Sequence, residues 1–227
     1  MFNGIGVPLS GRGTHGWGVG NPLGAPSIMY NADAWYRGDR LVTLNGSTVS
    51  KWTDINNGVE ATQTTESSQP TYDADAINER PGLVFDGDND HLRADSLASL
   101  ASGDDQPIYA LTVFNGSADG CIWSFGRSTD DNPLFALMVV DGSLQLWRRD
   151  DAASEIKINC GSAQDDTSIY LEFNGTTLNT WNNGVKTVTS ANIDLGVTTL
   201  DRFTIGALGR TGETELYNGT ISEVAIT

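Results

Sequence analysis

The sequence contains no long hydrophobic run, almost no helical periodicity, and only two cysteines and two histidines among its 227 residues. No apolar stretch approaches the roughly 18 to 20 residues that cross a bilayer, and the N-terminus has neither a basic segment nor the apolar stretch of a Sec signal. We therefore expect no membrane partner and no Sec-type signal.

Basic residues are scarce. The chain has 13 Lys and Arg against 29 Asp and Glu, which gives a formal net charge of -16. A field of this sign repels phosphate backbones, so we expect no nucleic-acid partner. The hydrophobic content of 38%, with 8% aromatic residues, is enough to form a folded core.

The two cysteines, Cys121 and Cys160, both lie in strand-like runs. A buried free thiol is the commoner state for such residues, and we expect it here. A disulfide is the alternative, and it requires that the fold bring the two residues together.

The dominant pattern is a succession of short apolar runs separated by turn residues. Ten Asn-Gly or Asp-Gly pairs fall mostly between these runs, which favours antiparallel hairpins over a parallel sheet. An early hairpin is predicted around Asn45-Gly46, and a single short helix or 3₁₀ turn over residues 95–101. The later runs cover residues 108–114, 121–125, 134–140, 144–147, 156–158, 169–173, 178–181, 185–188, 202–206 and 216–226.

Two motifs frame this succession. The first begins with W-x-D-x-x-x-G at Trp52, continues through a long polar connection, and ends with P-x-L-V-F-D-G-x-x-D-x-L from Pro81. The second consists of F-x-I-G from Phe203 and Y-N-G-T-I-S-E-V-A-I from Tyr217. Together they resemble the concanavalin A-like (laminin G-like) jelly rolls found in many bacteriophage virion proteins and secreted bacterial proteins. The resemblance covers residues 28–227 and implies an all-β fold, an antiparallel β-sandwich whose last strand pairs beside the first.

Catalytic motifs are missing. A retaining glycosidase needs two carboxylates about 5 Å apart, and the glucanases of this superfamily carry them as E-x-D-x-x-E or E-x-D-x-E on one strand. The nearest approach here, Glu213-Thr214-Glu215, has two acids only. His15 and His91 are isolated, and no G-x-S-x-G elbow or CxxC spacing occurs. We expect no catalytic residue and no enzymatic activity, and polysaccharide cleavage lost on changing Glu213 or Glu215 would reverse that expectation.

Asp86, Asp88 and Asp90 alternate in a D-x-D-x-D run that has the oxygen ligands preferred by Ca²⁺. The run lacks the Gly and the Glu that complete an EF-hand loop, because His91 and Leu97 stand at those positions. In the family that the sequence resembles, the F-D-G-x-x-D-x-L element mainly shapes a turn in which one Asp accepts backbone N–H groups, so a structural turn is the first interpretation. A bound Ca²⁺ is the alternative, because laminin G-like domains often bind Ca²⁺ at a loop rim.

Aromatic and acidic residues allow a second functional interpretation. Four Asp-Asp pairs punctuate the loops and are interpreted as a solvated acidic rim, with a cation-dependent contact for sugar or a neighbouring subunit as the alternative. Six tryptophans could form a platform for a glycan. Trp52, Trp123, Trp147 and Trp181 lie within strand runs, however, and most are expected in the core.

Residues 1–27 form a chemically distinct segment with eight glycines, three prolines, Arg12 and no acidic residue. Single hydrophobic residues recur along it, as in an extended arm that places side chains in pockets of a partner. Phe2, Ile5, Trp17 and Val19 are the candidate docking residues. An idle tail is the alternative.

These observations and the resemblance predict two parts: an extended arm, residues 1–27, and a jelly-roll β-sandwich, residues 28–227. The resemblance implies a non-enzymatic bacteriophage virion structural protein, either a head decoration protein or a fibre or tail accessory, located in the extracellular particle. Its expected partners are the major capsid protein or tail proteins, further copies of itself in a trimer, and a surface polysaccharide. The alternative is an exported carbohydrate-binding module or adhesin.

Overall fold

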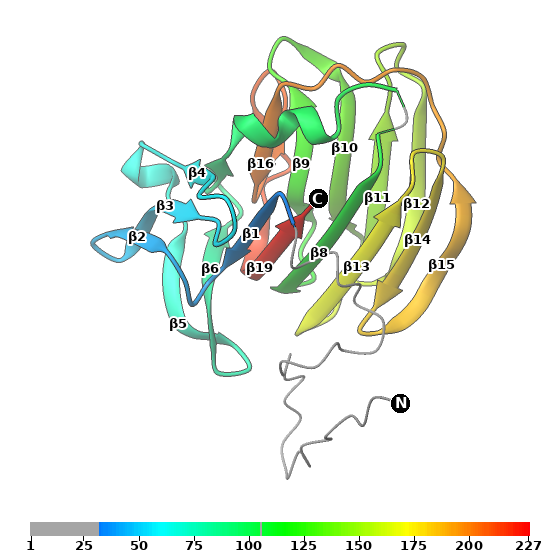
Figure 1. The fold of residues 1–227 in the computed structure, drawn as a ribbon. Coiled ribbons are helices and arrows are strands. Elements are labelled where there is room, and N and C mark those ends of the chain that lie inside the picture. Colours follow the sequence, from blue (N-terminus) through cyan, green and yellow to red (C-terminus); the bar gives the residue numbers. More distant parts are fainter. Residues whose placement is uncertain (1–31, 105) are drawn as a thin grey trace.

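The computed structural model describes residues 32–104 and 106–227, which form an antiparallel β-sandwich (Figure 1). Helical structure within these residues is limited to two 3₁₀ turns, η2 (Glu66–Ser68) and η3 (Asp95–Leu100). The strands are β1 (Ala34–Arg37), β2 (Val42–Asn45), β3 (Thr48–Thr53), β4 (Glu60–Thr62), β5 (Thr71–Ile77), β6 (Arg80–Asp86), β7 (Leu92–Arg93), β8 (Ile108–Asn115), β9 (Gly120–Arg127), β10 (Asp130–Val140), β11 (Ser143–Arg149), β12 (Glu155–Ser162), β13 (Thr167–Phe173), β14 (Thr177–Asn182), β15 (Val185–Asn192), β16 (Arg202–Ile205), β17 (Leu208–Gly209), β18 (Glu213–Thr214) and β19 (Asn218–Ile226).

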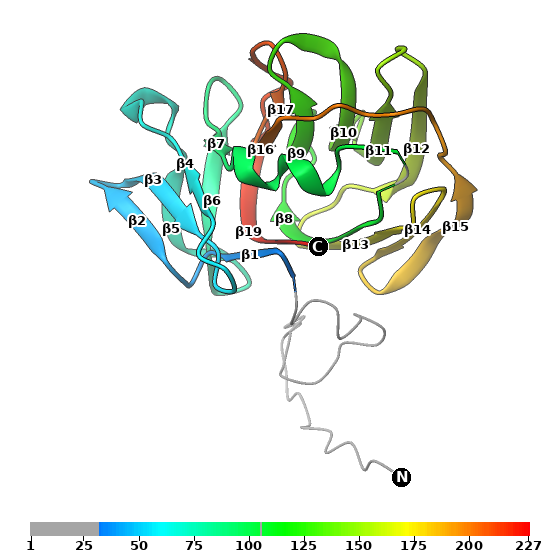
Figure 2. The ribbon, with the colours of Figure 1, turned by 45° about the horizontal axis from the view of Figure 1, so that its top comes forward.

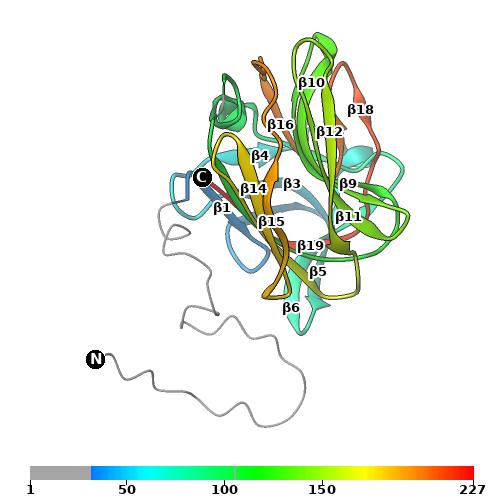
Figure 3. The same ribbon diagram turned by 90° about the vertical axis from the view of Figure 1, so that its right-hand side faces the viewer.

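The strands lie in two layers, which Figure 3 shows side by side. The first layer runs β5-β6-β19-β8-β13-β14-β15, with β1 also paired to β19. The second runs β2-β3-β4-β7-β16-β9-β10-β11-β12. One pairing between β3 and β5, Thr48 with Thr71, links the layers at one side. The 3₁₀ turn η3 packs beside β16 at the edge that faces the viewer in Figure 2.

The core between the layers is aromatic. Its largest fully buried side chains include Trp52, Trp123, Phe125 and Phe203, and the rings of Phe125 and Phe203 lie 4.8 Å apart. Burial of an indole requires a partner for its N–H. Trp52 donates to the carbonyl of Arg37 at 2.8 Å, and Trp123 donates to the hydroxyl of Thr112 at 2.9 Å. Both buried tryptophans therefore keep their hydrogen bonds inside the fold.

Several predictions from the sequence are confirmed. β2 and β3 form the early hairpin, with Gly46 at φ +66 in its turn, and η3 is the predicted short helical turn. β19 pairs with β1, as the resemblance implied. Cys121 and Cys160 are buried free thiols.

The aspartate of the W-x-D motif stabilises a turn that follows β3. The carboxylate of Asp54, which is buried, accepts backbone N–H groups from Asn56, Asn57 and Val59. An aspartate that satisfies three main-chain donors fixes the local chain direction. This motif is therefore structural.

The sequence predicted a long polar connection between Trp52 and Leu83, and this prediction is wrong. This stretch contains β4, η2 and β5, and β5 pairs with β6 along Thr71 to Asp73. Most side chains of β5 are exposed, so the strand carries no apolar alternation to mark it, and its main-chain pairing with β6 defines it.

None of the helical segments in the described part of the chain is long and apolar enough to cross a membrane.

Candidate ligand-binding pocket

A polar pocket of about 290 Å³ opens at one end of the first layer. It lies where the end of β1, the turn between β5 and β6, and the middle of β19 meet. This volume is at the lower limit of pockets that hold small molecules, roughly 300 Å³. Its lining residues are Arg37, Gly38, Asp39, Glu79, Arg80, Pro81, Ser222 and Glu223.

Backbone geometry brings these three segments together. The turn from β5 to β6 passes through Asn78 and Glu79 at φ 50 and 62, a left-handed pair typical of two-residue hairpin turns. On the opposite side, Gly38 donates its N–H to the carbonyl of Ser222 at 2.8 Å. A Cβ at position 38 would lie 2.3 Å from the carbonyl oxygen of Pro81, so only glycine allows this close approach.

Glu223 lies at the inner side of the pocket and is only 9% exposed. Its Oε1 accepts a 2.6 Å hydrogen bond from Nε1 of Trp35. Burial raises the pKa of the Glu223 carboxyl, and the Trp35 hydrogen bond and the charges of Arg37 and Arg80 offset this only in part. The pocket thus holds a carboxyl group that is buried and rigidly oriented.

The rim is formed by charged, planar side chains of both signs. Arg37 forms an ion pair with Asp39 at 3.0 Å, and Arg80 and Glu79 project from the hairpin turn. Two guanidinium groups and three carboxyl groups therefore surround a small volume. This set supplies both hydrogen-bond donors and acceptors, which suits a ligand with several hydroxyl groups, because each hydroxyl both donates and accepts.

The predicted metal residues form a turn between β6 and β7. Oδ1 of Asp86 accepts N–H groups from Asp88 at 2.8 Å and from Asn89 at 3.2 Å, and Oδ2 of Asp90 accepts the N–H of Asp86 at 3.1 Å. The structural turn is confirmed. No group of three or more His, Cys, Asp or Glu residues in 32–104 and 106–227 is arranged to hold a metal ion, so the Ca²⁺ alternative has no ligand cluster there.

The two carboxyl groups of this turn have opposite pKa shifts. Burial of Asp86 opposes its ionisation, but the backbone N–H groups of residues 88 to 90 outweigh it and lower the pKa. For Asp90, burial and the nearby charge of Asp86 raise the pKa to about 6. The turn therefore holds one firmly ionised carboxylate beside one that resists ionisation.

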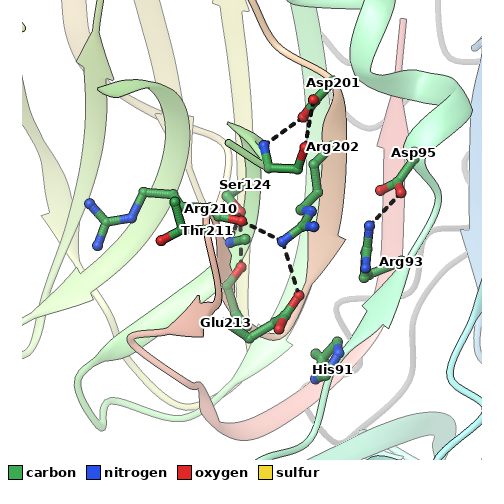
Figure 4. A network of polar contacts seen from close by, with 12 residues as sticks. His91, Arg93, Asp95, Ser124, Asp201, Arg202, Arg210, Thr211 and Glu213 are labelled. Atoms are coloured by element: carbon green, nitrogen blue, oxygen red, sulfur yellow. Dashed lines mark hydrogen bonds and ion pairs between the residues drawn. The ribbon is translucent and has the colours of Figure 1, made fainter. Parts of the chain in front are cut away.

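Glu213, the nearest approach to paired catalytic acids in the sequence, belongs to a structural network (Figure 4). It lies in the small β17–β18 hairpin and forms an ion pair with Arg202 of β16 at 3.4 Å. Arg202 also donates to the carbonyl of Arg210, and Thr211 donates to Asp131 at 2.7 Å. These contacts fasten residues 208–214 to the outer face of the second layer, where Leu208 covers a small apolar cluster.

The tryptophans divide between the core and the outer faces. Trp52 and Trp123 are fully buried as predicted, whereas Trp147 and Trp181 lie in strands but face outward and are partly exposed. Nζ of Lys157 lies 3.8 Å above the ring of Trp147, and Nζ of Lys186 lies 4.9 Å above that of Trp181. The prediction that most tryptophans of the strand runs are core is thus half right.

The proposed docking residues Phe2, Ile5, Trp17 and Val19 lie outside the described residues.

The sequence reasoning missed the pocket residues. Glu223 carried a usable signal, because a carboxylate inside the apolar run 221–226 must either face outward or be satisfied. Arg37 and Arg80 carried none, since surface arginines next to turns are ordinary. Only the pairing of β19 with both β1 and β6 brings the three together.

No protein-family model matches the chain, and no curated protein matches it in sequence. Solved structures do match. Domain 4 of AbnA, an extracellular arabinanase from Geobacillus stearothermophilus in complex with arabinotriose, aligns with a TM-score of 0.55 and 17% identity over 86% of this chain and 91% of that domain. The binding domain of botulinum neurotoxin serotype D aligns with a TM-score of 0.60 and 12% identity over 88% of this chain and 48% of its own.

A third match is an arabinofuranosidase complexed with arabinofuranosyl-α-1,2-xylobiose, with a TM-score of 0.58 and 14% identity over 79% of this chain and 47% of its own. The chain thus spans about half the length of the toxin and arabinofuranosidase structures. Identities this low establish the fold and no more. The chain has the β-sandwich fold that these three structures share with it.

Proposed function

We propose that this chain is a carbohydrate-binding domain without catalytic machinery of its own, and that the pocket beside Glu223 takes one unit of a short glycan. The observation that carries the proposal is the lining of the pocket. Arginine and carboxylate side chains of both signs converge on about 290 Å³ in a protein whose surface is otherwise strongly acidic. Neutral sugars, which present many hydroxyl groups and no charge, match such a mixed lining better than an anion does.

The fold supports the same interpretation. Two of the similar structures are complexes with arabinose-containing oligosaccharides. A pocket on a rigid sandwich needs little reorganisation to bind, and weak contacts are strengthened when several copies act together. The proposal that the domain has no catalytic activity of its own is based on the sequence, because no pair of acidic residues has the spacing of a glycosidase.

A glycan array probed with the full chain tests this proposal, followed by calorimetric titration of the oligosaccharides retained. Arg80→Ala and Glu223→Gln should each weaken binding about tenfold or more, the equivalent of about 1.4 kcal/mol. Lys51→Ala is the matched control, because Lys51 pairs with Glu60 at an exposed position of the second layer. Failure of every glycan to bind, or equal affinities in all variants, would refute the proposal. New reducing ends in the incubated glycans would refute its non-catalytic part.

The place of the chain in a phage particle stays a prediction from the resemblance, together with its trimeric state and its capsid or tail partners. A carbohydrate-binding module or adhesin needs none of these. Light scattering on the full chain and on a variant starting at Ser27 separates the two, because an assembly arm makes the oligomer depend on residues 1–26.

A further inference from the structure

One wall of the pocket is built on a β-bulge in β19. Ile221 pairs with Phe114 of β8 and Glu223 pairs with Val113, so Ser222 between them has no partner on β8. In a regular strand, consecutive side chains point to opposite faces, and a bulge breaks this alternation and re-aims the side chains beside it. Here Ser222 and Glu223 both line the pocket. The bulge thus gives the pocket two neighbouring polar side chains on one wall.

The carboxyl group of Glu223 has one oxygen that is engaged and one that is free. Oε1 accepts the 2.6 Å hydrogen bond from Nε1 of Trp35. Among the described residues no group donates to Oε2, and this oxygen is not closed off from solvent. The carboxyl cannot rotate without breaking the bond to the indole. Glu223 therefore presents a single acceptor, Oε2, to a ligand in the pocket.

Arg80 and Ser222 supply free groups of other kinds. Within the part of the chain that the structure describes, neither side chain forms a hydrogen bond or an ion pair, whereas Arg37 is paired with Asp39 at 3.0 Å. A guanidinium only donates hydrogen bonds, and a serine hydroxyl both donates and accepts them. The pocket accordingly offers a charged acceptor from Glu223 and a charged donor from Arg80 within about 290 Å³, close enough for one sugar ring to reach both.

No aromatic side chain of the described residues lines this pocket. A sugar ring held here therefore gains nothing from stacking, and its recognition depends on hydrogen bonds to its hydroxyl groups. Hydrogen bonds to charged groups are the strong ones. A site of this kind rejects an analogue that lacks the matching hydroxyl, because a desolvated charged group is then left without its partner.

We infer, on the basis of the proposed function, that the pocket recognises two hydroxyl groups on adjacent carbons of a neutral sugar. One hydroxyl donates to Oε2 of Glu223, and its neighbour accepts from the guanidinium of Arg80. Adjacent hydroxyls suit this pair because each can donate or accept as the facing group requires. The ligand class is a sugar with a free vicinal diol, and a sugar whose diol is blocked by a linkage or by an N-acetyl group is excluded.

The change Glu223→Gln alters this contact in a defined way. The indole N–H of Trp35 needs an oxygen beside it, so the amide oxygen takes the place of Oε1 and the amide nitrogen takes the place of Oε2. The acceptor that faces the ligand becomes a donor, while the size of the side chain stays the same.

A fluorine scan with the full chain tests the inference. The first probes are the methyl glycosides of arabinofuranose, xylose, galactose, glucose and mannose. The sugar that binds best is then measured with each hydroxyl in turn replaced by fluorine, which has nearly the size of a hydroxyl, donates no hydrogen bond and accepts only weakly. In NMR titrations the affinity should fall about tenfold or more at two adjacent positions and less than about twofold at the others.

Variants assign the two sensitive positions. In Glu223→Gln the loss at one position should shrink to about threefold or less, because an N–H group and not a carboxylate then faces the fluorine. In Arg80→Ala the loss at the neighbouring position should shrink in the same way. Lys51→Ala, which changes an exposed ion pair of the second layer, should keep both losses.

Sensitive positions that are not adjacent, or losses that neither variant changes, would overturn the inference and leave glycan binding by the domain in place. So would a failure of every methyl glycoside to bind while the array retains a glycan. If no glycan binds in either experiment, the proposed function itself fails. Near-ultraviolet circular dichroism checks the fold of the variants, and if Glu223→Gln is unfolded, the wild-type scan and Arg80→Ala give the same decision.

Discussion

The indole N–H of Trp35 on β1 donates a 2.6 Å hydrogen bond to the buried carboxyl of Glu223 on β19. The pairing of Arg37 with Glu223 and of Trp35 with Ala225 sets the two side chains next to each other on the outer face. A residue near the start of the domain thus orients a carboxyl group four residues from its end. The pocket proposed to bind a glycan therefore depends on correct pairing of β1 with β19.

Trp35→Phe keeps an aromatic ring but removes the donor. The variant should lose about 1 to 3 kcal/mol of the free energy of unfolding, because the buried carboxyl loses a hydrogen bond. In a Glu223→Gln background the same change should cost less, since a neutral amide tolerates a missing donor better than a carboxylate does. Urea unfolding of the four proteins at pH 7 measures the coupling, and additive losses would contradict it.

Asp90 should make the stability depend on pH. Its pKa is raised by burial and by the charge of Asp86, from an ordinary value of 3.8 to about 6. The folded state therefore holds this proton more tightly than the unfolded state does. This contribution is fully present below pH 3.8 and is lost as the pH rises through about 6.

Asp90→Asn removes the titrating group and should flatten this part of the curve. Relative to the wild type, its free energy of unfolding should be similar near pH 3.8 and higher by about 1 to 2 kcal/mol at pH 7, allowing for partial solvent screening. Asp75→Asn, at an exposed position of β5, is the control, because its charge is not among those that raise the pKa of Asp90. Parallel pH profiles for Asp90→Asn and the wild type, measured by thermal unfolding, would show that Asp90 ionises freely.

Gly126 of β9 is required by the close approach of the β17–β18 hairpin. A Cβ there would lie 1.9 Å from the carbonyl oxygen of Gly209. Gly126→Ala should therefore destabilise the protein by about 1 to 3 kcal/mol through overpacking. Gly212→Ala is the matched control in the hairpin turn, with no atom within 4 Å of its Cβ, and should stay within about 0.5 kcal/mol of the wild type. Equal melting temperatures for the two variants would contradict the packing.

Cys121 and Cys160 should be inert toward thiol reagents in the folded protein. Burial raises the pKa of both thiols, to about 11 for Cys160, so the reactive thiolate is scarce at neutral pH. Titration with a chromogenic disulfide should detect no fast-reacting thiol in the native chain and two after denaturation. A reducing agent should leave the melting temperature unchanged. Rapid native labelling at either residue would show that the strand covering it opens.

The sequence analysis identified the strands that carry apolar residues, because alternation and Asn-Gly turns report directly on burial and chain reversal. It failed for β5, whose exposed side chains carry no such pattern. It also failed for Trp147 and Trp181, because the sequence alone does not show which residues of a strand point to the core and which point to the outer face. The pocket was beyond its reach for a further reason. Arg37, Arg80 and Glu223 are distant in sequence, and only the pairings of β19 join them.

The D-x-D-x-D run shows how a local pattern can suggest two kinds of site. Alternating carboxylates suit both a cation and a turn, and the choice depends on what the backbone offers. Here Asp86 receives three main-chain N–H groups from residues 88 to 90. That geometry follows from how Asp86 ends β6 and cannot be read from residue types alone.

The most direct test of the proposed function is an NMR titration of the ¹⁵N-labelled full chain with the glycan that binds best on the array. If the pocket is the binding site, the largest saturable shifts should come from the amides of Gly38, Arg80 and Ser222. Amides of Gln145 and Trp147, on the outer face of the second layer, should stay in place. Shifts that gather around Trp147 while the pocket amides remain still would contradict the account.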